Sequence, residues 1–255
     1  MFRYLRVVSC VLVTTTILSF APSQAAVKYV KKPVVLTVFA AASLNGVFVA
    51  LGKIFEKSHP GTVFRFSFLA SSNLATQLAA GAPADVFASA SPVDMKMARS
   101  RVPKSYYFAA NHVVLGISRK NPLGIKTLQD LNNPKVKWIQ CAHQVPCGMA
   151  ADAALAAEGT VKSKPVSLEP KVTSAVTKLL VGEVDAAIIY HSDVMQHRNA
   201  LKEVAFRSRT ATFTEYPIGV VSRSSHLALA NAFVALVRSP QGVELLTHAG
   251  FDRTK

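Results

Sequence analysis

The sequence predicts an α/β protein with a mostly parallel sheet covered by helices on both faces. Short β-branched runs alternate with amphipathic helices along most of the chain, which is the pattern of such sheets. Half of the residues are hydrophobic and no low-complexity tract occurs, as expected of a protein with a sizeable core. The 230 residues that remain after a leader of 25 would fill one large domain or two lobes.

The first half of the chain begins with two strand–helix units. Residues 35–40 form a short run rich in β-branched residues that is flanked by lysines and prolines, as expected of a buried strand. Residues 43–57 repeat apolar side chains at helical spacing, and Ser43 stands where an N-cap is expected. The alternation continues with a strand at 62–69, a helix at 74–80 and a strand at 84–88.

The second half predicts another α/β unit. After a strand at 112–118, residues 121–134 carry the turn signals that would accompany a change of lobe. We expect lobe 1 to comprise residues 26–112 and 216–255, and lobe 2 to comprise residues 113–215. The remaining predicted elements are strands at 138–141, 184–190 and 216–221 and helices at 148–157, 173–181, 227–237 and 242–249.

Residues 1–25 have the features of a secretory signal peptide. Arg3 and Arg6 precede an apolar run at 7–20, and small residues follow at Ser23-Gln24-Ala25. The run is shorter than the ~20 residues that span a bilayer, so an uncleaved anchor is the weaker alternative. We expect the protein to be exported to the periplasm or the extracytoplasmic cell surface.

The chain is strongly basic, with 29 Lys and Arg against 14 Asp and Glu and a formal net charge of +15. These cations are scattered, whereas a nucleic-acid binder concentrates them on one face with interleaved aromatic residues. We therefore expect no nucleic-acid partner. In an exported protein such a charge favours attraction to an anionic cell surface, and it would also draw anions toward the protein.

Outside the signal peptide the chain contains two cysteines, Cys141 and Cys147. In an oxidising compartment this close pair favours a local disulfide. The alternative is a metal site formed by Cys141, His143 and Cys147, which lacks a clear fourth ligand. The seven histidines show no His-x-x-x-His or His-Glu-x-x-His spacing, so we expect them to be surface residues. We expect no direct cation ligands.

Three places share one local pattern, in which a strand ends, a small or kinking residue follows, and a helix begins. They are residues 41–43, 70–72 and 145–148. A helix N-terminus presents unpaired N–H groups and the positive end of the helix dipole, so each place is a candidate anion-binding corner. A serine before a helix is more often a plain cap, but three corners at strand ends of two lobes together predict an anion site.

Two stretches resemble the molybdate-binding proteins of ABC importers. They are residues 36–44, Leu-Thr-Val-Phe-Ala-Ala-Ala-Ser-Leu, and residues 70–90, which begin Ala-Ser-Ser-Asn-Leu-Ala. The resemblance spans nearly the whole mature chain and continues through residues 145–148, 187–193, 216–218 and 249–251. It implies the two-lobed periplasmic-binding-protein fold of type II, with an oxyanion held in the cleft between the lobes.

The resemblance also implies a set of ligand-binding residues. Ser43 and Ser71 would each offer a hydroxyl and a backbone N–H, Cys147 and Val172 a backbone N–H, and Tyr190 its phenolic hydroxyl. The family often has alanine at the position of Cys147, and pairing with Cys141 resembles a variant within the family. A tetrahedral dianion without protons only accepts hydrogen bonds, and all these groups can donate. We expect molybdate and tungstate as ligands, an ABC permease as partner, no cofactor and a monomer.

Several alternatives stay open. Without the resemblance, Tyr190 is equally typical of the edge of a core, and Val172 of ordinary packing. Helix-terminus corners do not identify the central atom, so the ligand could be sulfate or phosphate. An enzyme is the second class, although the chain lacks a Gly-x-Ser-x-Gly elbow, a phosphate loop and a dinucleotide fingerprint. The third class is a surface-adhesion module, which export and positive charge would suit.

Overall fold

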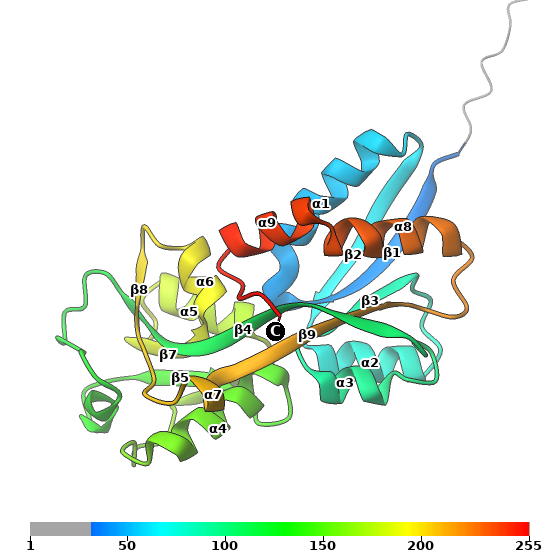
Figure 1. The fold of residues 1–255 in the computed structure, drawn as a ribbon. Coiled ribbons are helices and arrows are strands. Elements are labelled where there is room, and N and C mark those ends of the chain that lie inside the picture. The colour runs from blue at the N-terminus through cyan, green and yellow to red at the C-terminus, as the bar shows by residue number, and fades with distance from the viewer. Residues whose placement is uncertain (1–31, 255) are drawn as a thin grey trace, which may run out of the picture. The chain divides into compact units, whose positions relative to one another are not determined.

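The computed structural model describes residues 32–254. A mixed β-sheet forms the centre of this part of the chain (Figure 1). The predicted signal peptide lies outside these residues. Along the sheet the strand order is β2-β1-β3-β9-β4-β7-β5-β6, and β8 pairs with β4. The strands are β1 Val34–Ala41, β2 Thr62–Leu69, β3 Val86–Ala88, β4 Ser105–Ser118, β5 Trp138–Cys141, β6 Ser167–Glu169, β7 Ala186–Tyr190, β8 Leu201–Val204 and β9 Phe213–Val220.

Helices cover the sheet on both faces. The α-helices are α1 Asn45–Ser58, α2 Ser71–Ala79, α3 Pro92–Met97, α4 Pro146–Glu158, α5 Val172–Leu180, α6 His191–Gln196, α7 Arg209–Thr212, α8 Leu227–Arg238 and α9 Pro240–His248, and the 3-10 helices are η1 Ala42–Leu44 and η2 Leu128–Asn132. Across residues 32–254, none of the helices has the length and apolar character needed to traverse a membrane.

The prediction of a mostly parallel sheet is right for each end and wrong for the middle. Strand β1 is parallel to β2 and β3, and β5 is parallel to β6 and β7. In the middle, β4 is antiparallel to β7, β8 and β9, and β9 is also antiparallel to β3. These two strands carry the chain from one end of the sheet to the other and back (Figure 1), so they run in opposite directions.

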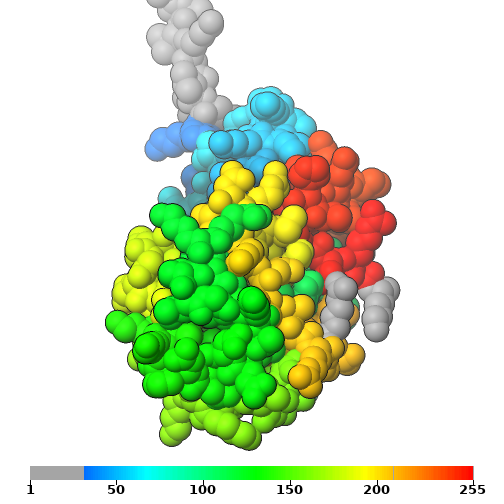
Figure 2. Space-filling view, turned by 90° about the vertical axis from the view of Figure 1, so that its left-hand side faces the viewer, coloured from blue at the N-terminus to red at the C-terminus, as the bar shows by residue number. Residues whose placement is uncertain are grey.

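The elements at the first end of the sheet enclose one hydrophobic core on each face. Because side chains alternate along a strand, Leu36 and Val38 of β1 pack with Phe48 of α1 and Phe233 of α8. Phe39 faces the other way, toward the core that is formed with α2 and α3. Figure 2 shows the early and late segments side by side, with α1 next to α8 and α9.

The elements at the second end share a separate core. Trp138, Leu179 and Ile189 are almost fully buried there, between the strands β4, β5 and β7 and the helices α4 and α5. Ala42 and Ala70, which directly follow β1 and β2 at the first end, also belong to this core. The two ends of the sheet therefore meet through these small side chains.

Some elements differ from the prediction. Helix α2 begins at Ser71 and not at residue 74, because Ser71 and Ser72 form the first turn of the helix where polar residues indicated a connection. Strand β4 begins at Ser105, seven residues before the predicted start at residue 112. The short elements α3, α6, α7, β6 and β8 were not predicted, because each is too short to show a hydrophobic period.

Candidate functional site

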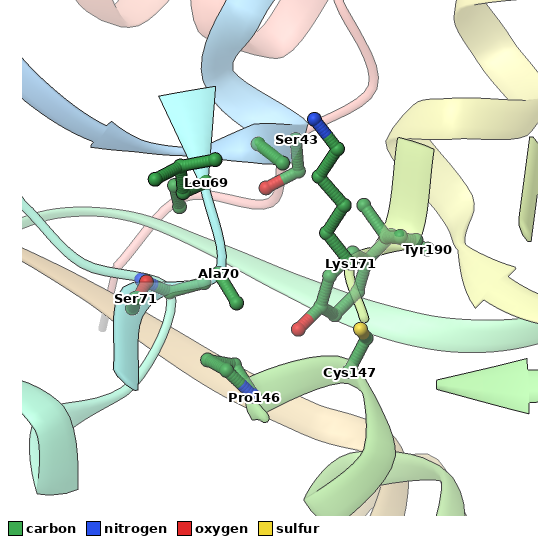
Figure 3. A pocket seen from close by; sticks show the side chains of 12 residues that line it. Ser43, Leu69, Ala70, Ser71, Pro146, Cys147, Lys171 and Tyr190 are labelled. Atoms are coloured by element: carbon green, nitrogen blue, oxygen red, sulfur yellow. The ribbon is translucent and has the colours of Figure 1, made fainter. Parts of the chain in front are cut away.

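A small cavity of about 20 Å³ lies where the two ends of the sheet meet (Figure 3). This volume is little more than the 10–15 Å³ that one water needs, so the cavity is of a size that suits a compact ligand. All five residues that the sequence assigned to ligand binding line it: Ser43, Ser71, Cys147, Val172 and Tyr190.

Three helices begin at this cavity without a side-chain cap. Helix α2 starts at Ser71, α4 at Pro146 and α5 at Val172, and no side chain caps any of these three N-termini. The first N–H groups of a helix have no acceptor within the helix. By contrast, α3 and α9 are capped by the hydroxyls of Ser91 and Ser239. The N–H groups of Ser71, Cys147 and Val172 are therefore available to an anion, and the dipoles favour one.

Ser43 is held by a contact that the sequence did not reveal. The expectation that Ser43 caps the following helix is wrong, because Ser43 lies inside η1 and makes no cap hydrogen bond. Its Oγ lies 3.0 Å from Oη of Tyr216, and both side chains are buried. If Tyr216 donates in this contact, the hydroxyl hydrogen of Ser43 is left for a ligand.

Ser71 is oriented by a backbone donor. Its Oγ accepts a hydrogen bond of 2.9 Å from the backbone N–H of Ala90, which also lines the cavity. Because the oxygen is engaged as an acceptor, the hydrogen of this hydroxyl remains free to donate.

Tyr190 carries a buried hydroxyl without a protein partner. The residue is 1 % exposed, and within residues 32–254 its Oη makes no hydrogen bond. Burial raises the pKa of Tyr190 well above its usual value, and the nearby Tyr216 and Asp193 raise it further. The phenol therefore stays protonated, and an unpaired buried donor is costly unless a ligand accepts from it.

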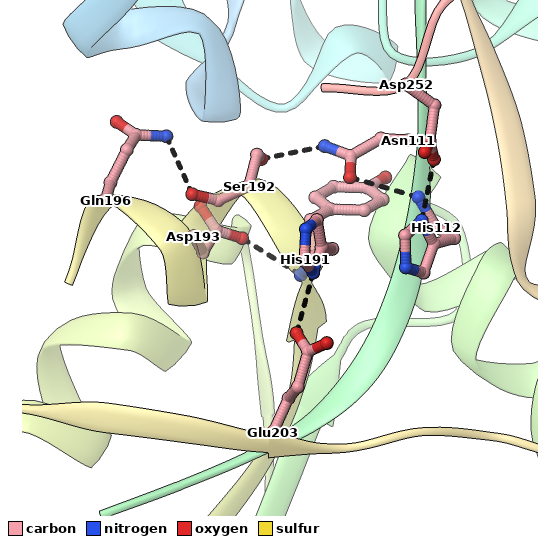
Figure 4. Close-up of polar contacts among 9 residues, drawn as sticks. Asn111, His112, His191, Ser192, Asp193, Gln196, Glu203 and Asp252 are labelled. Carbon is pink, nitrogen blue, oxygen red and sulfur yellow. Dashed lines mark hydrogen bonds and ion pairs between the residues drawn. The ribbon is translucent and has the colours of Figure 1, made fainter. Parts of the chain in front are cut away.

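Polar contacts hold the Tyr190 segment against β4 (Figure 4). The carboxylate of Asp193 accepts from the backbone N–H of Tyr190 at 3.0 Å, and Asn111 Nδ2 donates to Ser192 Oγ at 2.7 Å. Burial raises the pKa of Asp193 to about 7, although the Tyr190 N–H acts in the opposite direction. The start of α6 is thus fixed to the long strand that crosses the sheet.

Cys141 and Cys147 form a disulfide, which confirms the favoured prediction. The alternative metal site is wrong, because the thiols are joined and His143 instead pairs with Asp152 at 2.7 Å. The disulfide ties the end of β5 to the first turn of α4. The following residue, Gly148, packs so closely that a Cβ there would lie 1.9 Å from the carbonyl oxygen of Ala142.

Three residues of the site were not found from the sequence. Tyr216 supports Ser43 from β9, Ala90 supports Ser71 from the segment that follows β3, and Lys171 lines the cavity beside Val172. No local pattern could assign the first two, because their contacts span 173 and 19 residues of sequence. For Lys171, the neighbouring Val172 was the available signal.

A sheet with a core at each end and a small donor-lined cavity between them defines a two-lobed solute-binding protein. The sequence places it more narrowly: residues 36–252 match the bacterial extracellular solute-binding proteins, and the chain belongs to this family.

Known proteins agree with this placement. The molybdate-binding protein ModA of Mycobacterium tuberculosis is 37 % identical over 221 residues, which is 86 % of this chain and 84 % of that protein. Among solved structures, the periplasmic molybdate-binding protein of Azotobacter vinelandii matches with a TM-score of 0.76 and 20 % identity, over 86 % of this chain and all of the other. The sulfate-binding protein SubI of M. tuberculosis matches with a TM-score of 0.73 and 21 % identity, over 87 % of this chain and 88 % of the other. The predicted two-lobed periplasmic-binding-protein fold is confirmed.

Proposed function

We propose that this protein captures molybdate, and also tungstate, for an ABC importer. The observation that carries the proposal is the buried hydroxyl of Tyr190, which has no partner within residues 32–254 and lines the same small cavity as Ser43 and Ser71. The 37 % identity to a molybdate-binding protein supports this choice of ligand.

The ligand would be held by neutral donors alone. Ser43 and Ser71 would each give a hydroxyl and a backbone N–H, Cys147 and Val172 a backbone N–H, and Tyr190 its hydroxyl. Dipoles that the fold holds in place can stabilise a buried dianion, since they need no reorganisation when the ion arrives. All these groups donate, which suits an ion that carries no proton.

The donors would come from two lobes that close on the ion. We assign residues 26–112 and 216–255 to lobe 1 and residues 113–215 to lobe 2, in agreement with the division of the hydrophobic cores. Closure would be the signal that a membrane permease recognises. The protein would act as an exported monomer outside the cytoplasmic membrane.

The same geometry argues against catalysis. A serine nucleophile needs a neighbouring base. Among the described residues, Ser43 Oγ contacts Tyr216 and Ser71 Oγ accepts from the Ala90 N–H, and neither contact supplies a base.

Calorimetric titration of refolded, ligand-free protein tests the proposal. We expect one molybdate or tungstate per chain to bind tightly and sulfate to bind far more weakly. Equal or tighter binding of sulfate or phosphate would instead identify a carrier of another oxyanion.

The double variant Ser43→Ala/Ser71→Ala should lose most of the molybdate affinity and keep the circular dichroism spectrum of the wild type. Thr76→Ala is the matched control, because Thr76 is exposed on the same helix as Ser71. Unchanged affinity in the double variant would contradict the site.

A further inference from the structure

A cationic side chain lines the cavity beside the neutral donors. Lys171 immediately precedes α5 and is partly buried. In Figure 3 its extended side chain points from the side of Cys147 toward the side of Ser43. A ligand between these residues would lie beside a positive charge, in addition to the five neutral donors.

Lys171 has no counter-charge among the described residues. Within residues 32–254 no carboxylate lies within ion-pair distance of its ammonium group. By contrast, Lys178, seven residues further along the chain in α5, pairs with Glu169 at 2.8 Å and with Glu183 at 3.7 Å. An ammonium group without a counter-charge beside an anion site interacts with whatever anion enters.

The strength of that interaction depends on the charge of the ligand. Coulomb energy is proportional to the product of the two charges, so one ammonium group attracts a dianion about twice as strongly as a monoanion at the same place. Hydrogen-bond donors and helix dipoles also bind a dianion more strongly than a monoanion of the same shape. An ammonium group beside the ligand adds to this difference in proportion to the charge of the ligand.

We propose that Lys171 is a specificity-determining residue that favours dianionic over monoanionic tetrahedral oxyanions in this site. The proposal rests on the proposed function and adds to it the basis for recognising ligand charge. A lysine whose ammonium group remained in solvent at the rim of the cavity would change the affinity for both kinds of ion slightly and equally.

The test compares tungstate, a dianion, with perrhenate, a monoanion of the same shape. Calorimetric titrations at about pH 7.5 would use the wild type, Lys171→Gln, Lys171→Arg and Lys137→Gln. Lys137 is the matched control, because it is exposed and immediately precedes Trp138, at the end of β5 opposite Cys141. Melting of the ligand-free variants checks that each is folded.

We expect Lys171→Gln to weaken tungstate binding about tenfold and perrhenate binding about threefold, because the loss in log affinity scales with ligand charge. Lys171→Arg should retain the preference for tungstate, and Lys137→Gln should behave as the wild type. The fall in tungstate affinity between about 20 and about 500 mM salt should become shallower in Lys171→Gln, which gives a readout even where perrhenate binds too weakly to titrate.

The outcomes separate the two proposals. A wild type that binds no tetrahedral oxyanion would overturn the proposed function and this inference with it. A wild type that binds tungstate, together with a Lys171→Gln variant of unchanged tungstate affinity and salt dependence, would overturn the role of Lys171 alone. Equal losses for both ions would do the same.

Discussion

At the scale of single residues, neighbouring groups engage the hydroxyls of the two serines in the cavity. Ser71 Oγ accepts from the Ala90 N–H, and Ser43 Oγ contacts the hydroxyl of Tyr216. Tyr190 Oη has no partner within the described part of the chain. A hydroxyl has a single hydrogen, so occupying the oxygen with a neighbouring donor leaves that hydrogen for the ligand. We expect these contacts to prepare Ser71, and Ser43 if Tyr216 donates, for binding an anion.

Tyr190→Phe should separate binding from stability. Removing the hydroxyl takes one charge-assisted hydrogen bond from the ligand, which corresponds to a loss of affinity of roughly 10- to 100-fold. The free energy of unfolding of the ligand-free protein should stay the same or rise by up to about 1 kcal/mol, because an unpaired buried polar group is removed. Titration and urea unfolding measure the two effects.

Tyr107→Phe, at an exposed position, is the control for this substitution. Loss of stability without loss of affinity would show that the Tyr190 hydroxyl has a structural role.

Asp94 should make stability depend on pH. It is 2 % exposed, its Oδ2 has no hydrogen-bond partner within residues 32–254, and burial raises its pKa from 3.8 to about 6. The folded state therefore holds this proton more tightly than the unfolded state. The resulting stabilisation is complete below about pH 4 and is lost as the pH rises through about 6.

Asp94→Asn removes this titration. The stability of this variant relative to the wild type should be greater at pH 7 than at pH 4. The difference between the two free energies of unfolding should change by at most about 3 kcal/mol over this range. Urea unfolding at several pH values measures the difference. Asp130 gives a comparison of opposite sign, because the N–H groups of Lys126 and Thr127 lower its pKa. A difference that does not change between pH 4 and 7 would show that Asp94 titrates normally.

At the scale of elements, the site is built from helix beginnings that lack caps. In a capped N-terminus, such as that of α9, the side chain of the cap residue Ser239 accepts a hydrogen bond from a free backbone N–H of the first turn. Helices α2, α4 and α5 have no such side chain and point their first turns at the cavity. These three helices lack the stability that a cap would provide, and a bound anion could act as the missing acceptor.

The disulfide should stabilise the start of α4 without contributing a ligand contact. Closing so short a loop is expected to add about 2 kcal/mol to the free energy of unfolding. The variant Cys141→Ala/Cys147→Ala should lose about that amount, whereas molybdate affinity should fall less than tenfold because residue 147 keeps its backbone N–H. Urea unfolding and titration test this. Reductant should destabilise the wild type and leave the double variant unaffected, and the opposite result would contradict the role of the disulfide.

At the scale of the whole molecule, two strands join the halves of the structure. Strands β4 and β9 pair with each other. In addition, β9 pairs with β3 of the first end of the sheet, and β4 pairs with β7 of the second end. Ser43 and Ser71 follow strands of one end. At the other end, Cys147 and Val172 follow strands, and Tyr190 is the last residue of β7. The site is therefore complete only when both ends are held together.

Most of the regular elements could be predicted from local patterns. Strand Thr62–Leu69 and strand Trp138–Cys141 have the predicted bounds, because both are short segments rich in aromatic and β-branched residues, which favour strands. The full length of β4 could not be predicted, since residues 105–111 mix aromatic and polar side chains and extend only through pairing with β9. Short elements such as β8 likewise depend on a partner strand.

The sequence by itself determined the order of the longer strands and helices, three candidate anion-binding corners, and five residues expected to face the ligand. These follow from periodicity, from small residues at helix starts and from resemblance to a family, all of which are local properties of the chain. The tertiary structure decided that Tyr216 supports Ser43, that Ala90 supports Ser71 and that Lys171 lines the cavity. Such contacts arise only when distant segments pack together, so no pattern of neighbouring residues contains them.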